Sequence, residues 1–184
     1  GGGGFHGVGG VIEGHVCPGF ARRPETERGL RQLDLTTVDD ADCRAVIDRL
    51  HAAGMQVVVW EVGVGLALPV FECRVSERAP GPLTPLPAAR GFGCHPSRGI
   101  ALLRALTEAV QSRLTLIAGA RDDIVVGDDW ADPAARCRAV EPLHDEGPGT
   151  LAYDRLPDHD EASFQADIAI ELQVLRSLGF EQAV

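Results

Sequence analysis

The stretch GFGCHPSRGIALLRALTEAVQSRLTLI, residues 91–117, decides the fold of this chain. From Arg98 to Ile117 its apolar residues recur every three or four positions, which is the spacing of one face of an α-helix. Ser97 is a favourable N-cap directly before this run, and Gly119 is a residue type that often ends helices. We therefore predict a helix here, with a core-facing stripe made of Leu103, Leu106, Val110, Leu114 and Ile117.

A second, polar stripe on the same predicted helix consists of Arg104, Glu108, Gln111 and Thr115. Its flanks are small residues, a pattern that favours a surface facing a cleft. Glu108 and Gln111 lie one turn apart, so both offer an oxygen to one hard cation such as Mg²⁺, which commonly bridges to phosphate. Arg104 is placed to contact phosphate, or to pair with Glu108. The alternative is an ordinary solvated helix face carrying that one ion pair.

Towards the N-terminus the pattern predicts a helix over residues 39–53, capped by Asp39 or Asp40. A buried strand over Met55–Trp60 follows, and a second strand over Pro69–Val75 makes a strand pair. Helices and strands in this order predict an α+β fold, with a mixed β-sheet and helices packed on it.

Towards the C-terminus, residues 127–159 are rich in Asp, Pro and Gly and predict a long surface excursion. Asp160 is the predicted cap of a last helix that ends at Gly179. Residues 180–184 repeat the glycine-then-strand order seen after Gly54, which predicts that the chain ends inside a strand. The predicted buried face of the last helix is formed by Phe164, Ile168, Leu172, Leu175 and Leu178.

Composition narrows the class of function. The formal net charge is -10, which disfavours binding to nucleic acid or to anionic lipid. No apolar run approaches the about 20 residues of a membrane helix, and no signal peptide opens the sequence, so we expect a cytoplasmic protein without membrane association. All 17 basic residues are Arg, so any basic contact to phosphate comes from a guanidinium group.

The five cysteines are far apart, and no Cys-x-x-Cys pair is present. Their odd number and spacing predict free, mostly buried thiols rather than a zinc ribbon or disulfides. The Cys94 thiol is a candidate nucleophile, but no His–Asp partner set can be identified from the sequence, so packing in the core is its favoured role. For His95 a structural turn and contact with a site stay open, while solvated charge and helix capping are favoured over metal binding for the clusters 144–146 and 158–161.

Residues Gly91–Ser97, the helix after them and the run Ala118–Asp123 together resemble the central signature of YcaO proteins. The closest resemblance is to the branch that works with TfuA partner proteins, where the Gly-Cys-His and Gly-Ala-Arg-Asp-Asp elements recur. Leu33–Glu61 resembles the family's helix–glycine–strand unit, and Pro69–Phe71 resembles its next strand. The resemblance therefore spans about residues 33–124.

This resemblance implies a function. YcaO enzymes bind ATP with Mg²⁺ and phosphorylate a backbone amide oxygen of a peptide, after which a nucleophile attacks the activated carbon. The products are azolines or thioamides, and the protein mainly positions groups and neutralises charge. The implied partners are a peptide or protein substrate and a TfuA-like protein, and a homodimer is left open.

The resemblance also implies site residues. Glu108 and Gln111 match the family's Glu-x-x-Gln motif for metal and phosphate, and Glu13 is a further metal ligand. No catalytic residue is identified. Arg113 points away from the Glu108 stripe on an ideal helix. The implied nucleotide-binding residues are Glu108, Gln111, Arg104, Arg113, Arg121 and Glu13.

The sequence departs from the family at its N-terminal end. Where the family has a helix with two carboxylates, only Glu13 remains, and Gly10 stands in place of the other. We expect one partial YcaO-like domain over 1–184. Its parts are a degenerate glycine-rich remnant (1–32), the best-matching core (33–124), a loop-rich excursion (125–160), and a helix with the start of a strand (161–184).

Three alternatives to the enzyme remain. The first is a catalytically inactive YcaO-like remnant or partner that binds peptide or a TfuA-like protein. The second is a metal hydrolase that uses the acidic loop, and the third is a chain without function that does not fold alone.

Overall fold

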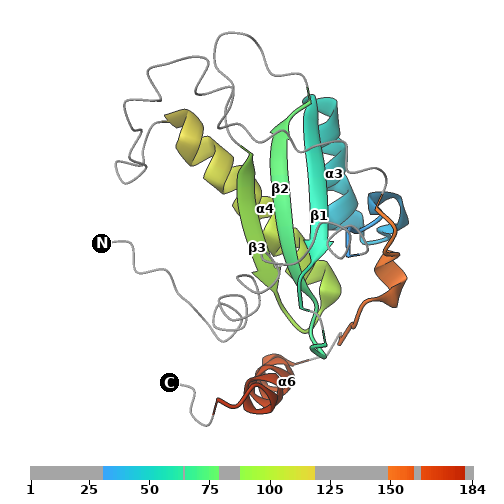
Figure 1. The fold of residues 1–184 in the computed structure, drawn as a ribbon, viewed down its shortest axis with the longest axis vertical. Helices are drawn as coiled ribbons and strands as arrows, with labels where there is room; N and C mark the ends of the chain where they lie inside the picture. The colour runs from blue at the N-terminus through green and yellow to red at the C-terminus, as the bar shows by residue number, and fades with distance from the viewer. Residues whose placement is uncertain (1–30, 64, 79–87, 119–148, 160–162, 181–184) are drawn as a thin grey trace.

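The computed structural model describes residues 31–63, 65–78, 88–118, 149–159 and 163–180. Its centre is an antiparallel sheet in the order β1-β2-β3, formed by β1 (Met55–Glu61), β2 (Val70–Glu77) and β3 (Ala89–Cys94). Helices α3 (Ala41–Ala52) and α4 (Arg98–Ala118) cover one face of the sheet, as Figure 1 shows. The prediction of an α+β fold is confirmed. Parallel pairing within the described ranges is seen at the isolated bridge Leu33–Leu151.

The two predicted strands are confirmed as β1 and β2, which pair with Val59 opposite Cys73. On the next strand Cys73 lies opposite Gly91, and Phe71 opposite Gly93. Cross-strand partners point to the same side of a sheet. The side towards the helices therefore carries bulky residues on β1 and β2 but glycines on β3. No strand was predicted for β3, because glycine has a low strand preference.

Helix α3 follows the prediction closely. Its N-cap is Asp40, whose side chain accepts a hydrogen bond from the Cys43 N–H at 2.8 Å. After its end Gly54 adopts a φ of 75°, a conformation that is cheap only for glycine. Cys43 and Ile47 are the fully buried residues of its inner face.

The buried face of α4 differs from the predicted apolar stripe. Leu114 and Ile117 are 59% and 58% exposed, so their assignment to the core is wrong. The buried positions are Ala101, Leu102, Ala105, Leu106, Ala109 and Arg113. The helix turns its small residues inward because it lies directly against the glycines of β3, where bulky side chains have no room.

Helix α6 (Phe164–Ser177) packs through Val174 and Leu175 on a second apolar cluster that includes Trp60. Its N-cap is Ser163 rather than the predicted Asp160, which lies outside the described residues. The predicted inner residue Phe164 is 74% exposed because it stands at the free first turn.

The C-terminal end of α6 is confirmed at Gly179, which has a φ of 88°. The N–H groups of Gly179 and Phe180 donate to the carbonyls of Arg176 and Leu175, and together they form a Schellman motif. The strand predicted over 180–184 lies almost wholly outside the described residues.

Residues 149–159 were predicted as the end of a surface excursion, and the structure corrects this. Leu151 bridges to Leu33, and the short 3₁₀ helix η3 (Tyr153–Arg155) follows. Tyr153 is 1% exposed and belongs to the core cluster beneath α3 and α4. The proline- and glycine-rich composition predicted the turns here but not the buried aromatic anchor.

Among the described residues, Cys43, Cys73 and Cys94 are buried and form no disulfide, as predicted for structural cysteines. Burial raises the pKa of Cys43 and Cys73 far above that of an exposed thiol. Within the described ranges, no helix combines the length and hydropathy that crossing a membrane requires.

Candidate functional site

The polar stripe of α4 lies along the outer edge of β3. Arg104, Glu108 and Gln111 are exposed, and Thr115 is half-buried. Glu108 Oε2 accepts a hydrogen bond from the backbone N–H of Phe92 at 3.2 Å, and Arg104 donates to the Cys94 carbonyl at 3.3 Å. Each of these side chains thus binds the strand instead of the other. In the part of the chain that the structure describes, no ion pair joins Arg104 to Glu108.

This arrangement fits part of a Mg²⁺–phosphate site. Mg²⁺ typically takes one or two protein oxygens and completes its shell with water and phosphate. Glu108 and Gln111 present a carboxylate and an amide oxygen from adjacent turns of an exposed face. The described residues contain no group of three or more His, Cys, Asp or Glu that could hold a metal without such help. Glu13, the other implied ligand, lies outside them.

The structure places Arg113 elsewhere. Its guanidinium is buried against β2, where NH2 lies 2.5 Å from Glu77 Oε1. This contact agrees with the expectation that Arg113 points away from the Glu108 stripe. The structure therefore brings Arg104, Glu108 and Gln111 onto one surface but not Arg113, while Arg121 lies outside the described residues.

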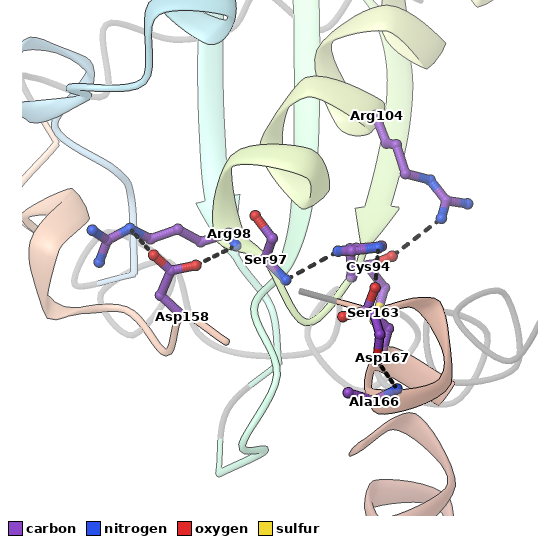
Figure 2. Close-up of polar contacts among 9 residues, drawn as sticks. Cys94, Ser97, Arg98, Arg104, Asp158, Ser163, Ala166 and Asp167 are labelled. Carbon is purple, nitrogen blue, oxygen red and sulfur yellow. Dashed lines mark hydrogen bonds and ion pairs between the residues drawn. The ribbon is translucent and has the colours of Figure 1, made fainter. Parts of the chain in front are cut away.

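The start of α4 is held by residues from distant parts of the chain (Figure 2). The Arg98 N–H donates to Asp158 at 3.0 Å, and the Arg98 guanidinium lies 3.5 Å from the same carboxylate. Asp158 thus accepts from the first N–H of the helix, while the carbonyl of Ser97, the predicted cap, accepts from the Ala101 N–H at 3.0 Å. Sixty positions separate Arg98 and Asp158, so no local sequence signal predicted this contact.

His95 sits at the same corner. Its Nδ1 accepts a hydrogen bond from the Ser97 N–H at 3.0 Å, and its Nε2 lies 3.9 Å from Asp167 of α6. A ring nitrogen that accepts from a backbone N–H carries no proton, so the imidazole is neutral in this arrangement. Burial lowers the pKa of His95, and Arg104 lowers it further, while Asp167 opposes the change. The turn role left open for His95 is thus the one that the hydrogen bond supports.

We expect this lowered pKa to make stability fall as the solution is acidified. Between the lowered pKa and the ordinary value of 6.5, the unfolded chain binds a proton at His95 that the folded chain does not. The free energy of unfolding, measured by urea titration, should therefore decrease between about pH 7.5 and about pH 5.5. His95→Gln should show a smaller decrease. An equal decrease in both proteins would contradict the assignment.

A separate charged group lies on the sheet face opposite α4. Glu72 is 3% exposed, and its Oε1 lies 2.8 Å from Arg74 Nε and 4.0 Å from Arg90 Nε. The Arg74 guanidinium also stacks over Trp60 at 5.0 Å from the ring centroid. Alternation along β2 was compatible with this face being polar, but the sequence did not predict a buried carboxylate there.

Comparison with known proteins agrees with this fold and identifies the family. A model of the YcaO cyclodehydratase family, described as ATP- and Mg²⁺-binding, matches residues 5–184. The chain belongs to the YcaO family. The family predicted from residues 33–124 is thereby confirmed.

Two relatives show where this chain falls within the family. An uncharacterized protein encoded in the tfuA 3′ region of Rhizobium leguminosarum bv. trifolii is 34% identical over 161 residues, which are 83% of this chain and 37% of that protein. An uncharacterized protein of Methanothermobacter thermautotrophicus is 32% identical over 184 residues, covering 96% of this chain and 45% of its own length. The first agrees with the predicted TfuA-associated type. The chain spans less than half the length of both relatives.

Solved structures show the same fold. A heterocyclase in complex with substrate and cofactor superposes with a TM-score of 0.58 at 21% identity, over 94% of this chain and 23% of that one. The heterocyclase TruD gives 0.53 at 22% identity, over 80% and 20%. At these identities the likeness establishes the fold alone.

Proposed function

We propose that this chain takes part in the ATP-dependent activation of peptide backbone amides, which yields a thioamide or an azoline. Membership of a family described as binding ATP and Mg²⁺ supports the proposal. The observation that carries it is the exposed stripe of α4, where Glu108 and Gln111 lie one turn apart beside the edge of β3. The substrate would be a peptide or protein in the cytoplasm, with a TfuA-like protein as partner and a homodimer as an open arrangement.

In this proposal Glu108 and Gln111 hold Mg²⁺, and Arg104 neutralises phosphate charge next to them. Bound ATP supplies the phosphoryl group that activates the amide oxygen. The residues of this chain position the phosphates and compensate their charge, which is the main protein contribution in phosphoryl transfer. Glu13 and Arg121 remain proposed members of the same site. For Arg113 the contact with Glu77 supports a structural role instead.

A catalytically inactive YcaO protein that binds a peptide or a TfuA-like protein is the second candidate. The sequence observation that favours it is Gly10, which stands where the family resemblance expects a second carboxylate. Such a protein would keep the fold and the stripe but bind nucleotide weakly.

Calorimetric titration with Mg²⁺ and a non-hydrolysable ATP analogue tests the proposal. We expect micromolar affinity in the unmodified chain and at least about tenfold weaker binding in Glu108→Ala, equivalent to about 1.4 kcal/mol. Thr107→Ala is the matched control, because Thr107 is exposed on the same turn and, among the described residues, its hydroxyl donates to the α4 carbonyls of Leu103 and Arg104.

Two results would decide against the enzyme. A folded chain that shows no nucleotide binding would favour the inactive partner. If Glu108→Ala weakens nucleotide binding no more than Thr107→Ala does, then Glu108 is not part of the nucleotide site.

A further inference from the structure

The contact between β3 and α4 is closer than side chains normally allow. A Cβ atom built on Gly91 would lie less than 3.0 Å from the backbone of Ala105 and Ala109. One built on Gly93 would lie less than 3.0 Å from the backbone of Ala101 and Ala105. Two glycines on the strand and a line of alanines on the helix therefore bring the two backbones together, a known use of glycine inside a strand.

This close approach brings the polar stripe to the open edge of β3. Within the described sheet β3 is an edge strand, and Phe92 and Cys94 are two residues apart on it. Two strand residues span about 6.7 Å and four helix residues about 6.0 Å. Every second residue of β3 therefore lies beside every fourth residue of α4. Arg104 meets the Cys94 carbonyl and Glu108 meets the Phe92 N–H in that common register.

We infer that the backbone N–H of Phe92 is a positioning group that fixes the Glu108 carboxylate for metal and phosphate binding. Gly91 and Gly93 allow the close contact between β3 and α4 that brings this N–H within hydrogen-bonding distance of Glu108. The inference rests on the function proposed above. The hydrogen bond engages Oε2 of Glu108 and leaves Oε1 for a ligand. A carboxylate already held in one direction loses less freedom when it binds a cation, so the affinity of the site rises. The sequence offered no sign of this, because the donor belongs to the backbone.

Phe92→Pro tests the inference by removing the N–H itself. That N–H points to the outer edge, towards Glu108, and not to β2, so the substitution costs no hydrogen bond of the ladder. Phe92→Ala keeps the N–H and measures the loss of the ring alone. In titrations with Mg²⁺ and the ATP analogue, we expect Phe92→Pro to bind about fivefold to tenfold more weakly than Phe92→Ala, about 1.0–1.4 kcal/mol.

The same pair is then compared in a Glu108→Ala background. Because the acceptor is gone, the difference between proline and alanine at position 92 should vanish. An equal affinity of the two variants in the original background would overturn the inference, and so would a difference that persists without Glu108.

Amide NMR keeps the inference testable if the proline variant does not fold. Glu108→Gln should shift the ¹⁵N–¹H resonance of Phe92 and speed its hydrogen exchange, and an unmoved resonance would overturn the inference. Failure of the proposed function looks different, because the unmodified chain then binds no nucleotide even if the Phe92 resonance responds. In that case the hydrogen bond stands, but its role in ligand positioning is refuted together with the function.

Discussion

Replacing Gly93 by Ala is expected to lower the free energy of unfolding by about 3 kcal/mol or more, at the upper end of the range for overpacked cores. The new methyl group would meet the Ala101 carbonyl and the Ala105 N–H of α4 at less than 3.0 Å. Both are backbone atoms of a regular helix, so no side chain can rotate to make room. Relief requires the whole helix to move away from the sheet, which would also open the core around Leu102 and Leu106.

Gly54→Ala is the matched control for this prediction. The same methyl group meets nothing within 4 Å at position 54, but the φ of 75° is unfavourable for alanine. We expect a loss of about 1 kcal/mol there. Urea unfolding followed by circular dichroism gives both values. If Gly93→Ala costs no more than Gly54→Ala, the helix and strand are not in the close contact described here.

Local sequence patterns predicted α3, β1 and β2 with ends accurate to one or two residues. These elements have their signals nearby, namely the cap Asp40, the β-branched run of β1 and the glycine at position 54. Strand β3 was missed for the opposite reason. Its glycines do not favour a strand by themselves. They stabilise the fold only by letting the backbone of α4 pack closely on β3.

The rotation of α4 could not be read from the helix alone. Hydrophobicity ranks Leu114 and Ile117 above the alanines, so periodicity assigned them to the core. The opposing surface decides otherwise, because the glycines of β3 contact the alanines of α4, and this rotation of the helix leaves Leu114 and Ile117 exposed. The family resemblance matched the glycine motif and the helix as one continuous block. It did not say which face of the helix contacts the glycines.

For the candidate site, the sequence predicted the polar side chains but not the hydrogen-bonding groups that position them. Glu108 and Gln111 are visible as a pair one turn apart, and the structure confirms that they share an exposed face. The Phe92 N–H is a backbone group, and Asp158 reaches α4 from far along the chain. Contacts of both kinds depend on tertiary structure, which residue spacing does not encode.

The second large effect concerns the buried pair formed by Arg113 and Glu77. Breaking a buried ion pair commonly costs about 3–5 kcal/mol, because the remaining charge stays buried without a partner. Here the side chains are 10% and 28% exposed, so the cost depends on which of the two is removed. Glu77→Ala leaves the more buried group, Arg113, unpaired. Its NH1 already lacks a hydrogen-bond partner within the described structure, so no second contact compensates.

We therefore expect an asymmetry between the two partners. Glu77→Ala should lower the free energy of unfolding by about 2–3 kcal/mol, below the full range because Glu77 is partly solvated. Arg113→Met should cost about 1 kcal/mol, because an apolar chain of similar length fills the site and the orphaned Glu77 reaches water. Urea unfolding of both variants, with the double variant to close the cycle, measures this difference.

The same two variants separate a structural Arg113 from one that binds nucleotide. A structural role requires a coupling energy with Glu77 and the asymmetry in stability. A phosphate ligand requires that Arg113→Met weaken binding of the ATP analogue while Glu77→Ala, in a folded protein, does not. Equal small costs for both variants, together with weaker nucleotide binding in Arg113→Met, would return Arg113 to the site that the family resemblance implies. The expected result would instead mean that the ion pair between Arg113 and Glu77 anchors the C-terminal half of α4 to β2. This anchor keeps Glu108 in register with the edge of β3.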